Sequence, residues 1–154
     1  MNVSARPPAH FRLGIVTGLQ EEADIVRDAL EAAPFAIAGN PALALDSTAV
    51  SCHGPGAARA AAAAAELIAG GARALLSFGV AGGCDPALPA GTVVLATGIR
   101  DFSAEPGEAI RRGETLWTNR EWRRRLQSAL LGTVLVEEAA IASFAAPVIG
   151  AREK

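Results

Sequence analysis

The sequence contains few cysteines, no long apolar run and no marked excess of charge of either sign. Its two cysteines, Cys52 and Cys84, lack the spacing of metal ligands, and we interpret them as reduced, half-buried thiols of a cytoplasmic protein rather than as a disulfide. The formal net charge of −2 provides no basic surface for a phosphate backbone, so nucleic acid is not expected as a partner. No apolar run reaches the roughly 18 residues that a membrane span needs.

Two nucleotide-binding signatures are missing as well. No G-K-[ST] triplet occurs, which excludes a P-loop. The segment "HGPGAAR" (53–59) has arginine where the dinucleotide fingerprint G-x-G-x-x-G requires its third glycine. A Rossmann-type nicotinamide module is therefore disfavoured, although a glycine turn ahead of a helix still offers free N–H groups to an anion.

What the sequence does contain is enough apolar material for one domain with a genuine core, since 51% of its 154 residues are hydrophobic. Residues 1–10 carry charge but lack the apolar stretch of a secretory signal, and we expect them to form a disordered lead-in. A single α/β domain is expected over residues 11–154.

Strand-like and helix-like segments alternate beyond residue 10, which predicts an α/β fold with a mixed, largely parallel sheet flanked by helices. The expected strands are 11–18, 35–38, 42–45, 47–52, 72–78 and 91–97, with another beginning at 133, and the expected helices are 19–33, 57–71 and 118–132, with another beginning near 150. The strand at 72–78 has polar residues only at its ends and is expected to be central and buried. The alanine-rich helix at 57–71 is expected to pack very closely on the sheet.

Three loops that contain glycine follow the carboxyl ends of expected strands, at 18–22, 53–56 and 79–83. Open α/β sheets bind ligands at that edge, and glycine lets a ligand approach the main chain closely. Tight turns are the alternative for each loop taken alone. Three such loops at one edge favour a ligand site.

The polar residues of these loops are the candidate site residues. Glu21 and Glu22 begin the helix at 19–33, where acids suit the positive end of the helix dipole, and on local evidence alone that is their role. The functional alternative is that one of them faces the strand ends and acts as a base on a water or a sugar hydroxyl. His53 is interpreted either as a donor to a ligand oxygen or as a structural loop histidine. The candidate phosphate-binding residues are Gly18, His53, Gly54 and Gly56.

Two further segments are interpreted as structural. The run "EWRRRLQ" (121–127) is predicted to be solvated surface. Trp117 and Trp122 are predicted to be packing residues, with base stacking by Trp117 as the alternative.

Three motifs resemble the nucleoside phosphorylase/nucleosidase superfamily, which includes purine nucleoside phosphorylases and methylthioadenosine/adenosylhomocysteine nucleosidases. They are the opening strand and acidic helix "GIVTGLQEEADIV", the glycine turn and small-residue helix "CHGPGAARAAAAAAELI", and the glycine cluster with a Pro/Gly hairpin in "LLSFGVAGGCDPALPAGTVVLAT". The segments "FGVAGGCDPALPAGTVV" and "WTNREWRRRLQSAL" are most similar to the hopanoid-associated phosphorylase branch, which is thought to remove adenine from adenosylhopane.

The resemblance implies cleavage of the N-glycosidic bond of a purine nucleoside through an oxocarbenium-like sugar. It implies that Glu22 handles the attacking water, as in the nucleosidases. It implies substrate contacts at Gly79, Val80, Ala81 and Gly82. No cofactor is implied, with inorganic phosphate as co-substrate if the reaction is phosphorolysis, and the expected partners are a small-molecule nucleoside and further copies of the chain.

The sequence departs from the family pattern in two respects. Ser77 and Val80 stand where phosphorylases of the family carry the arginine and serine that hold phosphate, which argues for hydrolysis, whereas the hopanoid-associated branch argues for phosphorolysis. After Glu138, nothing matches the family's ribose-binding glutamate or its proton-donating aspartate. We therefore expect the chain to correspond to the first part of a family member and to be weakly active or inactive alone. The alternative function is a non-catalytic nucleoside-binding or assembly domain.

Overall fold

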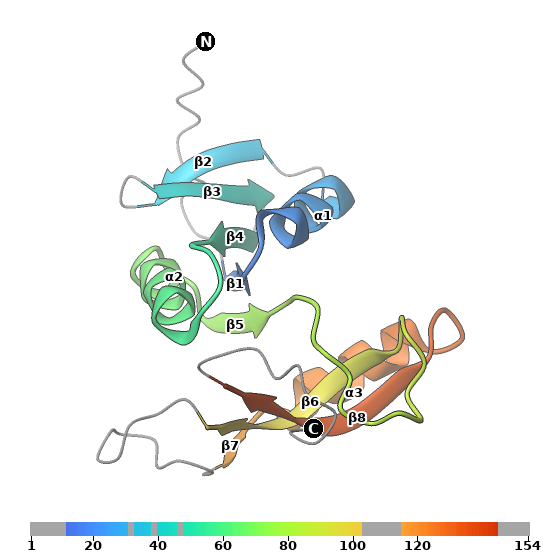
Figure 1. Ribbon diagram of the computed structural model, residues 1–154. Helices are drawn as coiled ribbons and strands as arrows, with labels where there is room; N and C mark the ends of the chain where they lie inside the picture. The colour runs from blue at the N-terminus through green and yellow to red at the C-terminus, as the bar shows by residue number, and fades with distance from the viewer. Residues whose placement is uncertain (1–11, 31–32, 38–39, 46–47, 103–114, 145–154) are drawn as a thin grey trace. The chain divides into compact units, whose positions relative to one another are not determined.

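The computed structural model describes residues 12–30, 33–37, 40–45, 48–102 and 115–144. The chain forms two compact units, Met1–Ala81 and Gly82–Lys154, each with its own sheet (Figure 1). The predictions of a lead-in at 1–10 and of a helix beginning near 150 lie outside the described residues. The prediction of a single domain over 11–154 stays a prediction.

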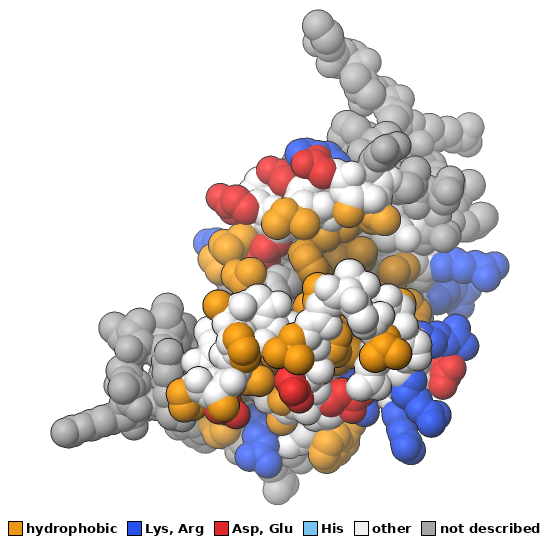
Figure 2. Space-filling model, turned by 90° about the vertical axis from the view of Figure 1, so that its right-hand side faces the viewer, with side chains coloured by type: hydrophobic (Ala, Val, Ile, Leu, Met, Phe, Trp, Pro, Cys, Tyr) orange, Lys and Arg blue, Asp and Glu red, His pale blue; other side chains and the backbone are white. Residues whose placement is uncertain are grey.

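The described surface carries both charged and apolar side chains. On the face drawn in Figure 2, apolar side chains reach the surface between acidic and basic ones. Within the described residues, no helix has the length and apolar character needed to cross a membrane.

The first unit is a five-stranded mixed sheet with a helix on each face (Figure 1). Its elements are β1 (Leu13–Thr17), α1 (Gln20–Leu30), β2 (Ala33–Ile37), β3 (Asn40–Leu45), β4 (Thr48–Cys52), α2 (Ala57–Ala69) and β5 (Ala74–Ser77). The strand order is β2-β3-β4-β1-β5, in which β4, β1 and β5 are parallel and β2 and β3 run antiparallel to their neighbours. The predicted α/β class, with a mixed sheet flanked by helices, is confirmed.

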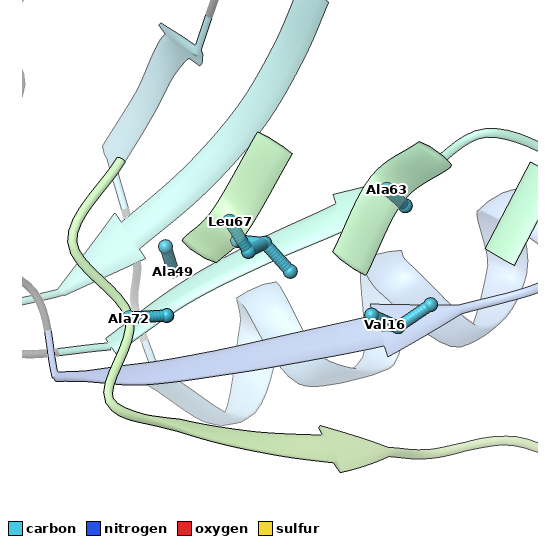
Figure 3. Packing of buried hydrophobic residues seen from close by; sticks show 5 residues of the cluster. All are labelled: Val16, Ala49, Ala63, Leu67 and Ala72. Carbon is cyan, nitrogen blue, oxygen red and sulfur yellow. The ribbon is translucent and has the colours of Figure 1, made fainter. Parts of the chain in front are cut away.

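Two apolar clusters fix the helices on this sheet, because alternate side chains of β1 point to opposite faces. The α2 face holds Val16, Ala49, Ala63, Leu67 and Ala72, and Figure 3 shows Ala63 and Leu67 extending from α2 toward the sheet. The α1 face holds Ile15, Ala23, Val26 and Val50. The carboxyl ends of β4, β1 and β5 are thereby held at one edge.

Gly14 of β1 explains how closely α2 approaches the sheet. A Cβ atom on Gly14 would lie 2.8 Å from Cδ2 of Leu75 and 3.0 Å from Cβ of Leu67. The contact with Leu67 would be tighter than nine in ten real Cβ contacts, so α2 lies against β1 where the strand has no side chain. The predicted close packing of this alanine-rich helix is confirmed.

The position of β5 differs from the prediction of a central, buried strand. β5 pairs only with β1 among the described strands and forms an edge of the five-stranded sheet. Leu75 is 42% exposed, and exposure alternates with partial burial along the strand. β1 is the middle one of the three parallel strands, with β4 on one side and β5 on the other.

The second unit is a three-stranded sheet with one helix (Figure 1). Its elements are β6 (Val93–Asp101), β7 (Thr115–Trp117), α3 (Arg120–Leu130) and β8 (Val136–Ser143). β6 is the middle strand, antiparallel to β7 and parallel to β8. β7 was not predicted, since three residues are too few for a clear alternation of apolar and polar side chains.

Arg123 corrects the prediction that the run at 121–127 is entirely solvated. Its side chain is only 16% exposed, and Nη1 donates to the carbonyl oxygen and to Oγ1 of Thr118 at 3.0 and 2.8 Å. Its Nε lies 3.6 Å from Oε1 of Glu138, an ion-pair distance beyond hydrogen-bond range. Thr118 in turn donates to the carbonyl oxygens of Ala96 and Thr97 on β6, so this network ties α3 to the sheet.

Trp117 corrects a second prediction. It was expected to be a packing residue, but it is 79% exposed at the end of β7. Trp122, on α3, is 37% exposed. The indole of Trp117 lies over Gly98 of the paired strand β6, since a Cβ on Gly98 would lie 3.3 Å from Cε3 of Trp117.

Candidate functional site

Glu22 has a buried carboxylate that binds the backbone where β1 ends. Its residue is 6% exposed, and Oε2 accepts hydrogen bonds from the N–H groups of Gly18 and Leu19 at 2.9 and 3.0 Å. Glu22 is the third residue of α1, so the bond from Leu19 is one half of a capping box. The helix-start role weighed for Glu22 is therefore present. Glu21, by contrast, is exposed.

The second carboxylate oxygen of Glu22 binds the loop after β5. Oε1 accepts a hydrogen bond from the N–H of Val80 at 2.9 Å, across 58 positions of the sequence. A Cβ atom on Gly79 would lie 2.6 Å from the same oxygen, so the carboxylate occupies the space that a side chain at 79 would need. A helix cap needs no such distant partner. This contact joins the ends of β1 and β5.

The loop after β4 reaches the same place. A Cβ atom on Gly18 would lie 3.9 Å from Cα of Pro55, which is ordinary van der Waals contact, and 3.8 Å from Oε2 of Glu22. The loops after β1, β4 and β5 therefore meet around Gly18 and Glu22. The sequence predicted these three loops at one edge, and the structure brings them together.

His53 is held by α2 rather than left free in its loop. Its Nε2 lies 2.9 Å from Oε2 of Glu66, and the imidazole is 17% exposed. This is the structural alternative weighed for His53. Binding of a ligand oxygen through His53 stays a prediction, and it would have to use the other ring nitrogen.

The remaining members of the predicted phosphate-binding set shape the turn into α2. Gly54 and Gly56 have φ values of 96° and 113°, in the left-handed region that favours glycine. Gly56 precedes the first residue of α2, whose first turn has no side-chain cap and no acidic residue. Nη1 of Arg59 lies 2.8 Å from the place of a Cβ on Gly54. Phosphate binding here stays a prediction.

The predicted substrate contacts divide into two groups. Gly79 and Val80 face Glu22 through their backbone, and the single N–H of Val80 is already bound to it. Val80 as a whole is 83% exposed. Ala81 and Gly82 are exposed, and Gly82 is the first residue of the second unit. Substrate contact by these four residues stays a prediction.

Thr17 is a feature of this region that the sequence analysis missed. It is the last residue of β1 and is 2% exposed, and its Oγ1 is buried with no hydrogen-bond partner in the described part of the chain. Thr17 could have been recognised in the sequence, because it is a hydroxyl residue at the end of an otherwise apolar strand. The contact between Glu22 and Val80 could not have been recognised from neighbouring residues, since it joins positions 58 apart.

No group of three or more His, Cys, Asp or Glu residues in the described ranges could hold a metal ion. Both cysteines are free thiols. The polar chemistry described around Gly18 is thus a carboxylate, a buried hydroxyl and backbone N–H groups.

The fold and the meeting of three loops define an α/β protein of the class that binds ligands at the carboxyl ends of parallel strands. The family model described as the phosphorylase superfamily matches residues 12–154, and the chain belongs to that superfamily. The superfamily resemblance inferred from the three motifs is confirmed.

Solved structures show the same fold at low sequence identity. Futalosine hydrolase of Helicobacter pylori aligns with a TM-score of 0.81 at 16% identity, over 94% of this chain and 71% of that one. The 5′-methylthioadenosine/S-adenosylhomocysteine nucleosidase of Campylobacter jejuni aligns with a TM-score of 0.78 at 18% identity, over 93% and 69%. A structure from Francisella philomiragia, described as a putative nucleosidase of the same kind, gives 0.76 at 20%, over 92% and 68%. No curated protein matches the sequence significantly.

Proposed function

We propose that the protein cleaves the N-glycosidic bond of a purine nucleoside by hydrolysis, with Glu22 acting on the attacking water. The observation that carries the proposal is the buried Glu22 carboxylate at the junction of three strand-end loops. Membership of the phosphorylase superfamily supports the reaction class. The similar folds of a nucleosidase and of futalosine hydrolase also support it.

Glu22 retains the acceptor capacity that this role needs. A carboxylate offers about four acceptor positions, two on each oxygen. Oε2 already accepts two N–H groups and Oε1 accepts one, so one position on Oε1 stays open with respect to the described residues. A water or a sugar hydroxyl bound there would be oriented by a carboxylate that backbone bonds hold in place.

The reaction follows from that arrangement. Water attacks the anomeric carbon, the bond from that carbon to the purine nitrogen breaks, and the purine leaves with the bonding electron pair. The proton that the water loses passes to the Glu22 carboxylate, which acts as a general base and then releases it to solvent, and the purine anion takes up one proton from solvent.

Water is favoured over phosphate as the nucleophile. A phosphate next to the buried carboxylate of Glu22 would bring like charges together. Ser77 and Val80 also stand where the resemblance places the phosphate-holding residues of phosphorylases. Arg59 places a positive charge beside the loop after β4, where it could attract phosphate. The test is therefore run both with and without phosphate.

The finer substrate assignment within this proposal is an adenine nucleoside. It rests on the resemblance to methylthioadenosine/adenosylhomocysteine nucleosidases and to the hopanoid-associated branch. The test therefore includes adenosine, 5′-methylthioadenosine and adenosylhopane.

The experiment is chromatographic detection of released adenine, with and without phosphate, from the 154-residue chain and from a version extended by whatever downstream sequence the genome encodes. We expect the extended version to release adenine without phosphate and the 154-residue chain to release little or none. Glu22→Gln should lower the rate of release by about 10²–10⁴-fold. Glu21→Gln is the matched control, because Glu21 is the exposed neighbour. If adenine is released only in the presence of phosphate, the reaction is phosphorolysis and the proposal of hydrolysis is wrong. Binding of nucleoside without release in either version would favour the non-catalytic alternative.

A further inference from the structure

We infer that Gly79 and Val80 are positioning residues for Glu22: the backbone after β5 fixes the carboxylate in the orientation that leaves one acceptor position on Oε1 open. This rests on the proposed function and deepens it. The sequence resemblance gave both residues to the substrate instead. In the structure, their backbone contacts Glu22 directly.

Position 79 needs glycine because the Glu22 carboxylate leaves no room for a side chain, and not because of the backbone conformation. The φ of Gly79 lies outside the left-handed region, unlike those of Gly54 and Gly56, so its conformation is open to alanine. The obstacle is contact, because a Cβ at 79 would lie 2.6 Å from Oε1 and 2.9 Å from both Cδ and Oε2 of Glu22. All three atoms belong to the carboxylate group.

A carboxylate on a long side chain normally moves aside, but this one is held. Three backbone N–H groups bind it at 2.9–3.0 Å, and Glu22 is buried on all but 6% of its surface. To reach ordinary contact with a methyl group at 79, the carboxylate would have to retreat by most of an ångström. That movement would lengthen its bond to Val80.

The N–H of Val80 fixes the orientation of the Glu22 carboxylate. This single N–H donates to Oε1, so it is not available to a substrate, and it occupies one of the two acceptor positions of that oxygen. The position that stays open is fixed by this bond. Val80 thus acts through Glu22, whichever ligand binds.

The test is a double-mutant cycle between Gly79→Ala and Glu22→Ala, read first by urea unfolding. Removing the carboxylate removes the obstacle, so Gly79→Ala should lower the urea midpoint when Glu22 is present and leave it unchanged or raised when it is absent. Gly83→Ala is the control, because a Cβ there meets nothing within 4 Å and its φ is also outside the left-handed region. Equal shifts in both backgrounds would show that Gly79 does not act through Glu22.

The second measurement is of kcat and KM, made on whichever form of the protein releases adenine. Misplacing a catalytic group by about 1 Å can cost 100-fold in rate, so Gly79→Ala should lower kcat by about that factor. KM should change less than about threefold, because the substrate itself is not contacted. A raised KM with unchanged kcat would make Gly79 a substrate contact and overturn the inference. So would an unchanged kcat beside a lowered urea midpoint.

The two proposals fail in different ways. If no form of the protein cleaves a nucleoside, hydrolysis by Glu22 is wrong. The positioning of the carboxylate by residues 79 and 80 would still be established by coupled urea midpoints.

Discussion

At the level of single residues, two polar side chains are buried near the carboxyl end of β1. Glu22 is buried and has three N–H partners, whereas the Thr17 hydroxyl a few residues earlier is buried and has none in the described part of the chain. Burying a polar group costs free energy unless it is hydrogen-bonded. Hydrogen bonds therefore offset the cost of burying Glu22, whereas none in the described part of the chain offsets the cost of burying the Thr17 hydroxyl.

We expect Thr17→Val to leave stability unchanged or to raise it by up to about 1 kcal/mol, because the lost hydroxyl makes no compensating bond. Urea unfolding measures this change. A loss of more than about 1 kcal/mol would show that Oγ1 binds a buried water or another partner.

At the scale of elements, a helix is held by what its buried face contacts. Arg123 of α3 is partly buried, with two hydrogen bonds to Thr118 and an ion pair to Glu138 of β8. Arg125, on the same helix, pairs with Glu121 four residues earlier, and both of these side chains are more than half exposed. The same residue type thus has a packing role at one position and a solvated role at the other.

We expect Arg123→Ala to cost about 2–3 kcal/mol, since hydrogen bonds from a charged group contribute about 1.5–3 kcal/mol. Arg125→Ala should cost less than about 0.5 kcal/mol, because exposed ion pairs contribute little. Urea midpoints of both variants and the wild type measure the difference. Equal costs would contradict the network that ties α3 to β6.

Most elements could be predicted from the sequence, because apolar spacing and glycine punctuation are local signals. The helix predicted at 57–71 is observed as α2, and the strand at 47–52 as β4. Local signals do not show lateral order in a sheet, so β5 was placed centrally although it forms an edge. The same limit applies to the site: its three loops were predicted, but the pairing of Glu22 with Val80 depends on the fold.

At the scale of the whole molecule, large apolar side chains remain on the surface of both units. Ile25 and Ile68 in the first unit are 60% and 56% exposed, and Leu131 in the second is 81% exposed. The outer edge of β5 adds backbone groups that no described strand pairs. Edges and apolar patches of this kind favour association.

We therefore expect the purified chain to self-associate as its concentration rises, as the family resemblance also implies. Sedimentation velocity across a concentration series measures this. Association through apolar side chains should persist in 1 M salt, where the screening length is only about 3 Å. Dissociation in salt would point to ionic contacts, and a monomer at every concentration would contradict the prediction.

The missing side chain of Gly14 has a consequence for how this sequence can vary. Any side chain at position 14 would need room that Leu67 and Leu75 now fill. An alanine at 14 therefore fits the present spacing of α2 and β1 best when one of those leucines is smaller. In a library of functional variants, these three positions should covary, with their summed volume kept nearly constant while the identity at each one changes.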